Sequence, residues 1–233
     1  LKISKKHNIH LIEDAAQAIG SSYKGKPLGT FGTFGCISFH DTKNIHCGEG
    51  GALIINDDNF LDRAEVIREK GTNRSAFFRG AVDKYRWIDR GSSYLMSEIN
   101  ACFLLDQIKS LDKVITKRMK LWEKYYEDFK DSAIETSEIY PGKVHNAHMF
   151  FIKTKSLKER TKLMKFLQKK KISTAFHYIP LHESLKTRKY YRFHKDDRYT
   201  TIESERLLRL PLYYSLRQKD VQYITRSIKE FYG

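Results

Sequence analysis

One lysine and one aspartate carry the functional hypothesis for this sequence. Lys43 lies in a turn between two apolar runs, residues 36–37 and 52–56, which are predicted to be strands. Asp14 follows a third apolar run, residues 11–12, which is also predicted to be a strand. Because proteins often place ligand-binding side chains in turns at strand ends, this amine and this carboxylate are candidates for one site.

An amine and a carboxylate are the two groups that a carbonyl cofactor such as pyridoxal phosphate requires. The amine holds the cofactor aldehyde as a Schiff base, and the carboxylate keeps the pyridine nitrogen protonated so that the ring withdraws electrons. A carboxylate about 4 Å from a cation attracts it by roughly 4 kcal/mol at an effective dielectric of about 20. Ser38, at the end of the strand before Lys43, can give a hydroxyl to the phosphate.

Each of these residues also has a simpler interpretation. The sequence has 43 lysines and arginines, so any one lysine is usually a solvated surface residue. Asp14 can be a helix N-cap, and Gly48, Gly50 and Gly51 can serve a turn that needs positive φ. The residues alone leave these alternatives open.

Several short motifs, in this order, resemble those of one family. They are Glu13-Asp14-Ala15-Ala16-Gln17, Ser38-Phe39-His40 leading to Lys43, Gly48-Glu49-Gly50-Gly51, and the segments at 68–74, 77–80, 91–97, 146–150 and 177–182. The sequence is similar to the pyridoxal-phosphate-dependent nucleotide-sugar aminotransferases of fold type I. Within that family it most resembles the transaminases that make dTDP-4-amino-4,6-dideoxygalactose for surface polysaccharides of the O-antigen and enterobacterial common antigen type.

The resemblance implies a role for each residue of a cofactor site. Lys43 would hold the cofactor and move protons, and Asp14 would pair with the pyridinium nitrogen. Gln17 would contact the ring hydroxyl, and Ser38 would bind the phosphate. In many relatives an asparagine reaches the phosphate of the neighbouring subunit; this sequence departs from that pattern with Ser93.

Substrate contacts are expected from two further regions. The segment 72–94 is rich in arginine and aromatic residues, and long irregular segments of this kind are often functional. The segment 177–182 would border the sugar-nucleotide cleft, by resemblance. Its two histidines are five residues apart with no carboxylate to complete a set, so no metal site is expected. The substrate candidates are Arg74, Arg79, His177 and Tyr178.

The resemblance also implies a fold and an architecture. The fold class is α/β, with residues 1–112 forming the C-terminal part of the large mixed-sheet domain and residues 113–233 forming a smaller α/β domain. Because the sequence starts at Leu1 in what reads as the end of a helix, we expect it to be the later part of a longer polypeptide.

The activity implied by the resemblance is a transamination. The amino group would pass from L-glutamate, through pyridoxal 5'-phosphate, to a dTDP-4-keto-6-deoxyhexose, in a homodimer with shared sites. A dehydratase on the same scaffold would have histidine in place of Lys43. The alternatives are an aminotransferase for another nucleotide keto-sugar, and a truncated, inactive homologue that acts only as a folded partner.

Composition limits the other classes of function. The net charge of +15 could attract nucleic acid, but the lysines are scattered and no recognition module is visible. A basic surface would instead attract a dianionic nucleotide sugar. The sequence has no run of eighteen apolar residues, no leader, and three cysteines without metal spacing. These features predict a cytoplasmic protein with free thiols and no membrane span.

The sequence pattern predicts the remaining elements. Helices are expected at residues 57–70, from a Ser97 cap through a lysine-rich stretch near residue 113, at 157–170, and at 221–231. Strands are expected at 148–153 and 172–178. Thr200 and Glu203 have the spacing of a capping box.

Overall fold

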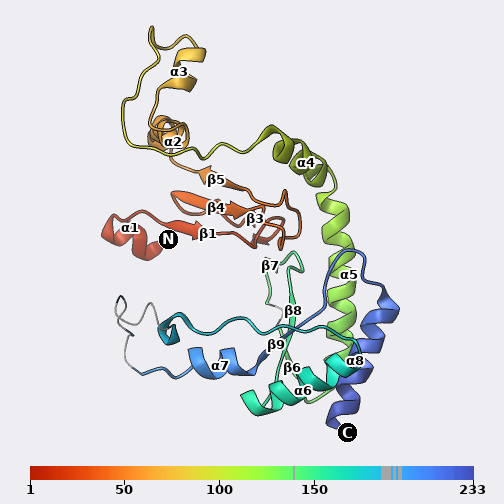
Figure 1. Cartoon of the computed structure of the whole chain (residues 1–233). Coiled ribbons are helices and arrows are strands. Elements are labelled where there is room, and N and C mark those ends of the chain that lie inside the picture. The colour runs from red at the N-terminus through yellow and green to blue at the C-terminus, as the bar shows by residue number, and fades with distance from the viewer. Residues whose placement is uncertain (139, 185–189, 191–192, 194–195) are drawn as a thin grey trace. The chain divides into compact units, whose positions relative to one another are not determined.

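The structure is a computed structural model, and it describes residues 1–138, 140–184, 190, 193 and 196–233 (Figure 1). It divides into two compact units, Leu1–Val114 with Gly142–Asn146, and Ile115–Pro141 with Ala147–Gly233. Our division of the domains at residues 112 and 113 remains a proposal. The structure adds that the short segment Gly142–Asn146 returns to the first unit.

The first unit is built on a mixed sheet of three strands. In the order of the sheet these are β1 (Ile12–Asp14), β4 (Phe34–Ser38) and β5 (Gly51–Ile55). β1 and β4 are parallel, whereas β4 and β5 are antiparallel and joined by the turn that contains Lys43. The strands that were expected on either side of this turn are therefore confirmed.

Shorter elements complete the first unit. A small antiparallel sheet joins β3 (Lys26–Pro27), β2 (Ser22–Tyr23) and β7 (Lys143–Val144). The expected helix at 57–70 is present as η1 (Asp58–Phe60) and α2 (Leu61–Arg68). The segment 72–94, expected to be irregular, begins with α3 (Arg74–Phe78). The unit also contains α1 (Lys2–His7) and α4 (Glu98–Lys109).

Glu13 organises the loop that leads into β4. Its carboxylate accepts hydrogen bonds from the backbone N–H groups of Gly29 (2.9 Å), Phe31 (2.5 Å) and Gly32 (2.7 Å). Burial tends to raise the pKa of this carboxyl, but the hydrogen bonds from Gly32, Gly29 and Phe31 lower it further than burial raises it. The loop is thus held by the ionised form of Glu13.

We expect Glu13→Gln to reduce the free energy of unfolding by about 1–2 kcal/mol at neutral pH, because charge-assisted hydrogen bonds are lost. The pKa of Glu13 is lower in the folded protein than in the unfolded chain, where it is about 4.3. The extra stability of the wild type is therefore fully present above the unfolded-state pKa and is lost as the pH falls through the folded-state pKa. Urea unfolding at neutral and at acidic pH measures this difference. The control is Glu123→Gln, at an exposed position of the helix α5 (Leu111–Phe129). An E13Q deficit that stays constant with pH would contradict the role of the charge.

The second unit packs three helices against a small antiparallel sheet. α5 (Leu111–Phe129) leads into it, and the break at Ser110 separates α5 from α4, where one long helix was expected. The sheet order is β6 (Glu135–Thr136), β8 (Phe150–Lys153) and β9 (Leu207–Leu210). α6 (Leu157–Lys169) and α8 (Gln218–Tyr232) supply the other helical faces, and η2 (Leu181–Glu183) and α7 (Thr200–Arg206) lie between them in sequence.

Alternation along the strands separates the core from the opposite face of this sheet. Phe150 and Ile152 on β8 are fully buried, as are Leu208 and most of Leu210 on β9. They pack with Tyr125, Phe129, Leu163, Val221 and Ile228 from the helices. The intervening residues Phe151, Lys153 and Arg209 belong to the other face, because side chains alternate along a strand.

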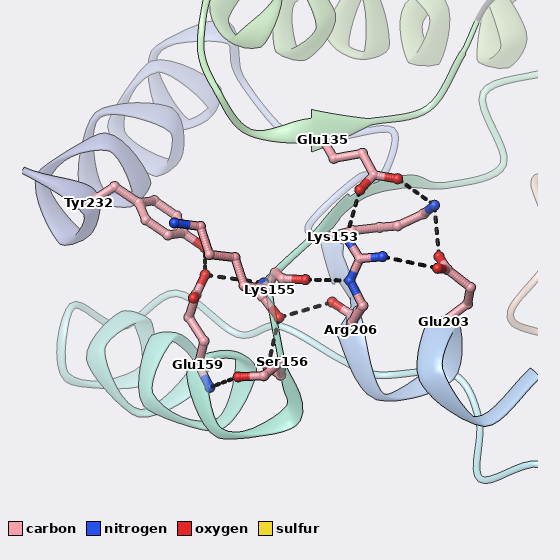
Figure 2. Close-up of polar contacts among 9 residues, drawn as sticks. Glu135, Lys153, Lys155, Ser156, Glu159, Glu203, Arg206 and Tyr232 are labelled. Carbon is pink, nitrogen blue, oxygen red and sulfur yellow. Dashed lines mark hydrogen bonds and ion pairs between the residues drawn. The ribbon is translucent and has the colours of Figure 1, made fainter. Parts of the chain in front are cut away.

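An ion-pair cluster ties β6 and β8 to α7 (Figure 2). The Lys153 ammonium contacts Glu135 (2.5 Å) and Glu203 (2.7 Å), and the Arg206 guanidinium contacts the same two carboxylates (2.7 and 2.9 Å). Arg206 Nε also donates to the Thr154 carbonyl (2.8 Å). The hydrogen bond from Lys153 is the largest of the effects that lower the pKa of the Glu135 carboxyl. Two cations and two carboxylates thus neutralise one another at this end of the sheet.

Two expectations for this unit are wrong. Residues 172–178 do not form a regular strand, since the structure has only an isolated bridge between Ala175 and Arg209 there. The Ile172 N–H is used at the end of α6, where it donates to the Leu167 carbonyl (2.9 Å). Thr200 does not cap α7: the N-cap is Tyr199, with no side-chain hydrogen bond.

Candidate active site

Asp14 and Ser38 lie at the same edge of the mixed sheet. Asp14 is the last residue of β1 and pairs with Cys36 of the parallel strand β4. Paired residues on parallel strands project from the same face, and Ser38 follows Cys36 by two residues, so Asp14 and Ser38 share that face. The face is open in the described chain, since Ile12 and Leu53, which also belong to it, are 63% and 52% exposed. The carboxyl ends of parallel strands are where α/β proteins bind ligands.

The turn that contains Lys43 is closed by backbone hydrogen bonds. Phe39 donates to Gly50 (2.8 Å), Cys47 donates to Phe39 (2.9 Å), and the Lys43 N–H donates to the His40 carbonyl (2.9 Å). Ile45 is fully buried and anchors the turn in a small apolar cluster. The turn therefore presents a half-buried Lys43 at a defined place just beyond β4.

A side chain at Gly50 would crowd its neighbours under this turn. A Cβ at Gly50 would lie 2.5 Å from Cys47 Sγ and 2.7 Å from Met96 Cε, which is closer than real side chains approach. The glycine cluster, noted in the sequence as an ordinary turn signal, therefore also permits close packing under the turn.

Two buried asparagines connect the lysine turn to the segment after Asp14. Asn44 Nδ2 donates to the Asn146 carbonyl (2.8 Å), and Asn146 Nδ2 donates to the carbonyls of Gln17 (2.8 Å) and Ile19 (2.8 Å). Both asparagines are less than one-tenth exposed. These hydrogen bonds connect Asn44, which follows Lys43, to the segment that follows Asp14 and contains Gln17. Our sequence reasoning missed it, although Asn146 opens one of the motifs that carry the family resemblance.

The three chemical groups of the site retain capacity to bind a ligand. Asp14 Oδ1 accepts one hydrogen bond, from the Ala16 N–H (3.1 Å), and Ser38 Oγ accepts one from the His40 N–H (3.3 Å). Within the described residues, the structure gives no hydrogen bond or ion pair to the Lys43 ammonium, the second Asp14 oxygen or the Ser38 hydroxyl proton. An amine, a carboxylate and a hydroxyl donor are the groups that pyridoxal phosphate needs, so the residues present fit this cofactor.

The other candidate binding residues of the first unit already contact other groups of the protein. Both guanidinium Nη atoms of Arg79 donate to the Glu65 carboxylate (2.8 Å each), a contact that raises the pKa of Arg79 and with which a substrate anion would compete. The Arg74 guanidinium lies over the Phe78 ring, 5.1 Å from its centroid. Ser93 is exposed and forms a backbone bridge with Glu69. The substrate and phosphate roles of these residues remain predictions.

His177 and Tyr178 belong to the second unit, where they line a cavity of about 390 Å³ together with Phe151, Lys153 and Leu207. Arg209 Nη1 donates to His177 Nδ1. Burial, and next the charge of Arg209, lower the pKa of His177, which favours the neutral imidazole. Arg209 was not among the residues selected from the sequence, because its contact with His177 depends on the fold of the chain.

Two kinds of feature are absent from the described residues. No group of three or more His, Cys, Asp or Glu side chains is arranged to hold a metal ion. No helix in the same part of the chain is long and apolar enough to cross a membrane.

A mixed sheet with a lysine turn after one strand and a carboxylate at the end of its parallel neighbour is the arrangement expected of the fold type I class of pyridoxal-phosphate-dependent enzymes. The chain belongs to the DegT/DnrJ/EryC1/StrS aminotransferase family, which it matches over residues 1–229. The expected fold class is thereby confirmed, as is the expected dependence on pyridoxal 5'-phosphate.

Individual relatives agree with this assignment. The chain is 32% identical over 239 residues to an uncharacterized protein of Methanocaldococcus jannaschii, an alignment that covers 99% of the chain and 62% of that protein. It superimposes on a DegT DnrJ EryC1 StrS aminotransferase from Brucella abortus with a TM-score of 0.85 and 26% identity, covering 100% of the chain and 60% of that structure. For Helicobacter pylori PseC, an aminotransferase involved in the biosynthesis of pseudoaminic acid, the TM-score is 0.86 at 23% identity, with 99% and 61% covered. The chain thus spans about 60% of the length of these relatives.

Proposed function

We propose that this protein is a sugar aminotransferase that moves an amino group from L-glutamate to a dTDP-4-keto-6-deoxyhexose, giving dTDP-4-amino-4,6-dideoxygalactose. The observation that carries the proposal is the juxtaposition of Asp14 and Ser38 at one sheet edge with the Lys43 turn, joined through the Asn44–Asn146 bridge. Membership of an aminotransferase family supports the reaction class. The finer substrate rests on the motif resemblance given above.

The residues divide the work of such a reaction. When bound, the cofactor supplies an electron-withdrawing ring that accepts the charge left at the reacting carbon. The Lys43 amine would take the proton from the α-carbon of the amino donor and return it to the carbon that was the aldehyde carbon of the cofactor, and it would do the reverse for the keto-sugar. The Asp14 carboxylate holds a proton on the ring nitrogen. Ser38 donates to the phosphate, and Gln17 is positioned on the segment that Asn146 holds.

Several properties support the rest of the proposal. The net charge of +15 favours encounter with a dianionic nucleotide sugar. PseC, which shares the fold, is an aminotransferase involved in the biosynthesis of pseudoaminic acid. We also propose a cytoplasmic homodimer with sites shared between subunits, in which Ser93 reaches the neighbouring phosphate, and surface polysaccharide synthesis as the setting.

The direct test is an amino-transfer assay of the full-length protein with pyridoxal phosphate, L-glutamate and a panel of dTDP- and UDP-linked keto-sugars. We expect 2-oxoglutarate and an aminated dTDP-sugar, identified by mass spectrometry and NMR, with the 4-keto-6-deoxyhexose as the preferred acceptor. Preference for a UDP-linked or 3-keto sugar would contradict the proposed substrate and favour an aminotransferase for another nucleotide keto-sugar. Cofactor binding without transfer to any acceptor would favour the inactive homologue.

A further inference from the structure

The second unit contains a cavity of about 640 Å³ between α6 and the segment that follows it. One wall is a stripe of α6, whose residues recur at helical spacing and therefore share a face. The other wall, residues 171–176, is held by the hydrogen bond from Ile172 to Leu167 (2.9 Å) and by the bridge between Ala175 and Arg209. The α6 stripe consists of Arg160, Thr161, Met164, Lys165 and Gln168.

Arg160 is the unusual residue of this cavity. Its side chain is among the buried ones, with 7% of the residue exposed. Nη1 donates to the Ser204 carbonyl (2.6 Å), and the guanidinium lies 4.8 Å from the centroid of the Phe176 ring. Nε is buried without a hydrogen-bond acceptor in the described chain. A buried guanidinium is costly unless its donors are satisfied, so an incompletely paired arginine in a cavity wall points to a missing anionic partner.

The charged side chains that line the cavity beside Arg160 are cations. Lys165 and Lys171 also line the cavity, and no carboxylate does. The structure gives neither lysine an ion pair within the described residues, whereas their neighbour Lys170 is paired with Glu230 (2.8 Å). Burial lowers the pKa of Arg160, and the charge of Glu205 opposes that effect without forming an ion pair. The described residues that line the cavity therefore carry a net positive charge.

The remaining lining is a mixture of apolar and hydroxyl groups. Met164, Ile172 and Phe176 give an apolar surface, and Thr161, Ser173 and Thr174 give hydroxyls. A volume of this size falls in the range of small-molecule sites, which combine an apolar lining with a few convergent polar groups. Because three cations line the cavity, a ligand with a dianionic group fits it better than a ligand with a single carboxylate.

We propose that this cavity binds a small organic phosphate whose dianionic group meets Arg160, Lys165 and Lys171 while its apolar part lies against Met164, Ile172 and Phe176. The site uses none of the residues assigned to the aminotransferase reaction. Binding there gives the Arg160 guanidinium an anionic partner and offsets the positive charge of the cavity lining. The bound phosphate would contact both α6 and residues 171–176, which lead to His177 and Tyr178. Binding can therefore change the position of those two residues.

The test uses full-length protein carrying 13C-methyl methionine, titrated with phenyl phosphate. Met164 is one of four methionines in this sequence, and Met164→Leu assigns its signal. We expect a saturable shift of the Met164 methyl resonance. A Lys165→Gln/Lys171→Gln double variant should weaken binding by about tenfold, because two exposed charge contacts to the phosphate are lost. Lys162→Gln, an exposed position on the same helix, is the matched control and should bind like the wild type.

Two further arms separate the contributions. Arg160→Gln should remove binding, and if that variant does not fold, the exposed lysine pair still decides the question. Phenol carries the ring without the charge and should not give the saturable shift. The proposal is overturned if phenyl phosphate produces no saturable shift at millimolar concentration, if phenol binds equally well, or if the double lysine variant retains wild-type affinity.

Discussion

Lys43→Ala is expected to abolish amino transfer and to remove the absorbance that marks the lysine-bound cofactor. Without the amine, neither covalent attachment nor proton transfer at the reacting carbon takes place, and loss of a general acid–base group alone costs about 10²–10⁴-fold in rate. Absorbance spectra after gel filtration with pyridoxal phosphate, together with the glutamate assay, measure both effects. Borohydride reduction followed by peptide mass spectrometry should place the cofactor on the Lys43 peptide of the wild type.

Two comparisons sharpen this prediction. Lys43→Arg keeps the positive charge but not the nucleophile, because a guanidinium stays protonated, so it should fail like alanine. Lys109→Ala changes a lysine in the last turn of α4 and should retain the spectrum and the activity. Covalent cofactor on another lysine in the wild type would exclude the proposed role of Lys43.

Asp14→Asn should retain covalent cofactor but lower the transfer rate by up to about 10³-fold. The reason is that the amide does not hold a proton on the ring nitrogen: a charge pair at about 4 Å amounts to roughly 4 kcal/mol at an effective dielectric of about 20, and 1.36 kcal/mol is tenfold in rate. Single-turnover kinetics with L-glutamate measure the rate directly. Asp14→Glu, which keeps the charge, should recover part of it.

The Asp14 result separates a chemical role from a structural one. Asp14 also accepts the Ala16 N–H, a contact that asparagine can keep through its carbonyl oxygen. The stability of the Asn variant should therefore remain close to that of the wild type, as should that of Asp58→Asn, an acidic control in the first turn of η1. A rate that is unchanged in Asp14→Asn would remove Asp14 from the reaction.

Local patterns allowed much of the fold to be predicted. The strands around the Lys43 turn, the Ser97 cap of α4 and the closing helix α8 appear where periodicity and capping chemistry placed them. The errors occur where another contact competes for a backbone group. The Ile172 N–H donates to a carbonyl at the end of α6 and does not pair with a strand. Near the start of α7, where a capping box was expected, Thr201 Oγ1 donates to the Asp197 carboxylate (2.6 Å).

The amino-acid sequence by itself determined the chemistry available to this protein. Residue types identify an amine, a carboxylate and a hydroxyl, and the sequence pattern predicts that they lie at or just beyond the ends of strands. The tertiary structure decided which groups meet and which are already occupied. Asn146 is distant in sequence from both Asn44 and Gln17, and only chain folding brings its amide between them. The pairing of Arg79 with Glu65 and the incomplete pairing of Arg160 are likewise consequences of packing, since burial and partner distance are properties of the folded chain rather than of any local pattern.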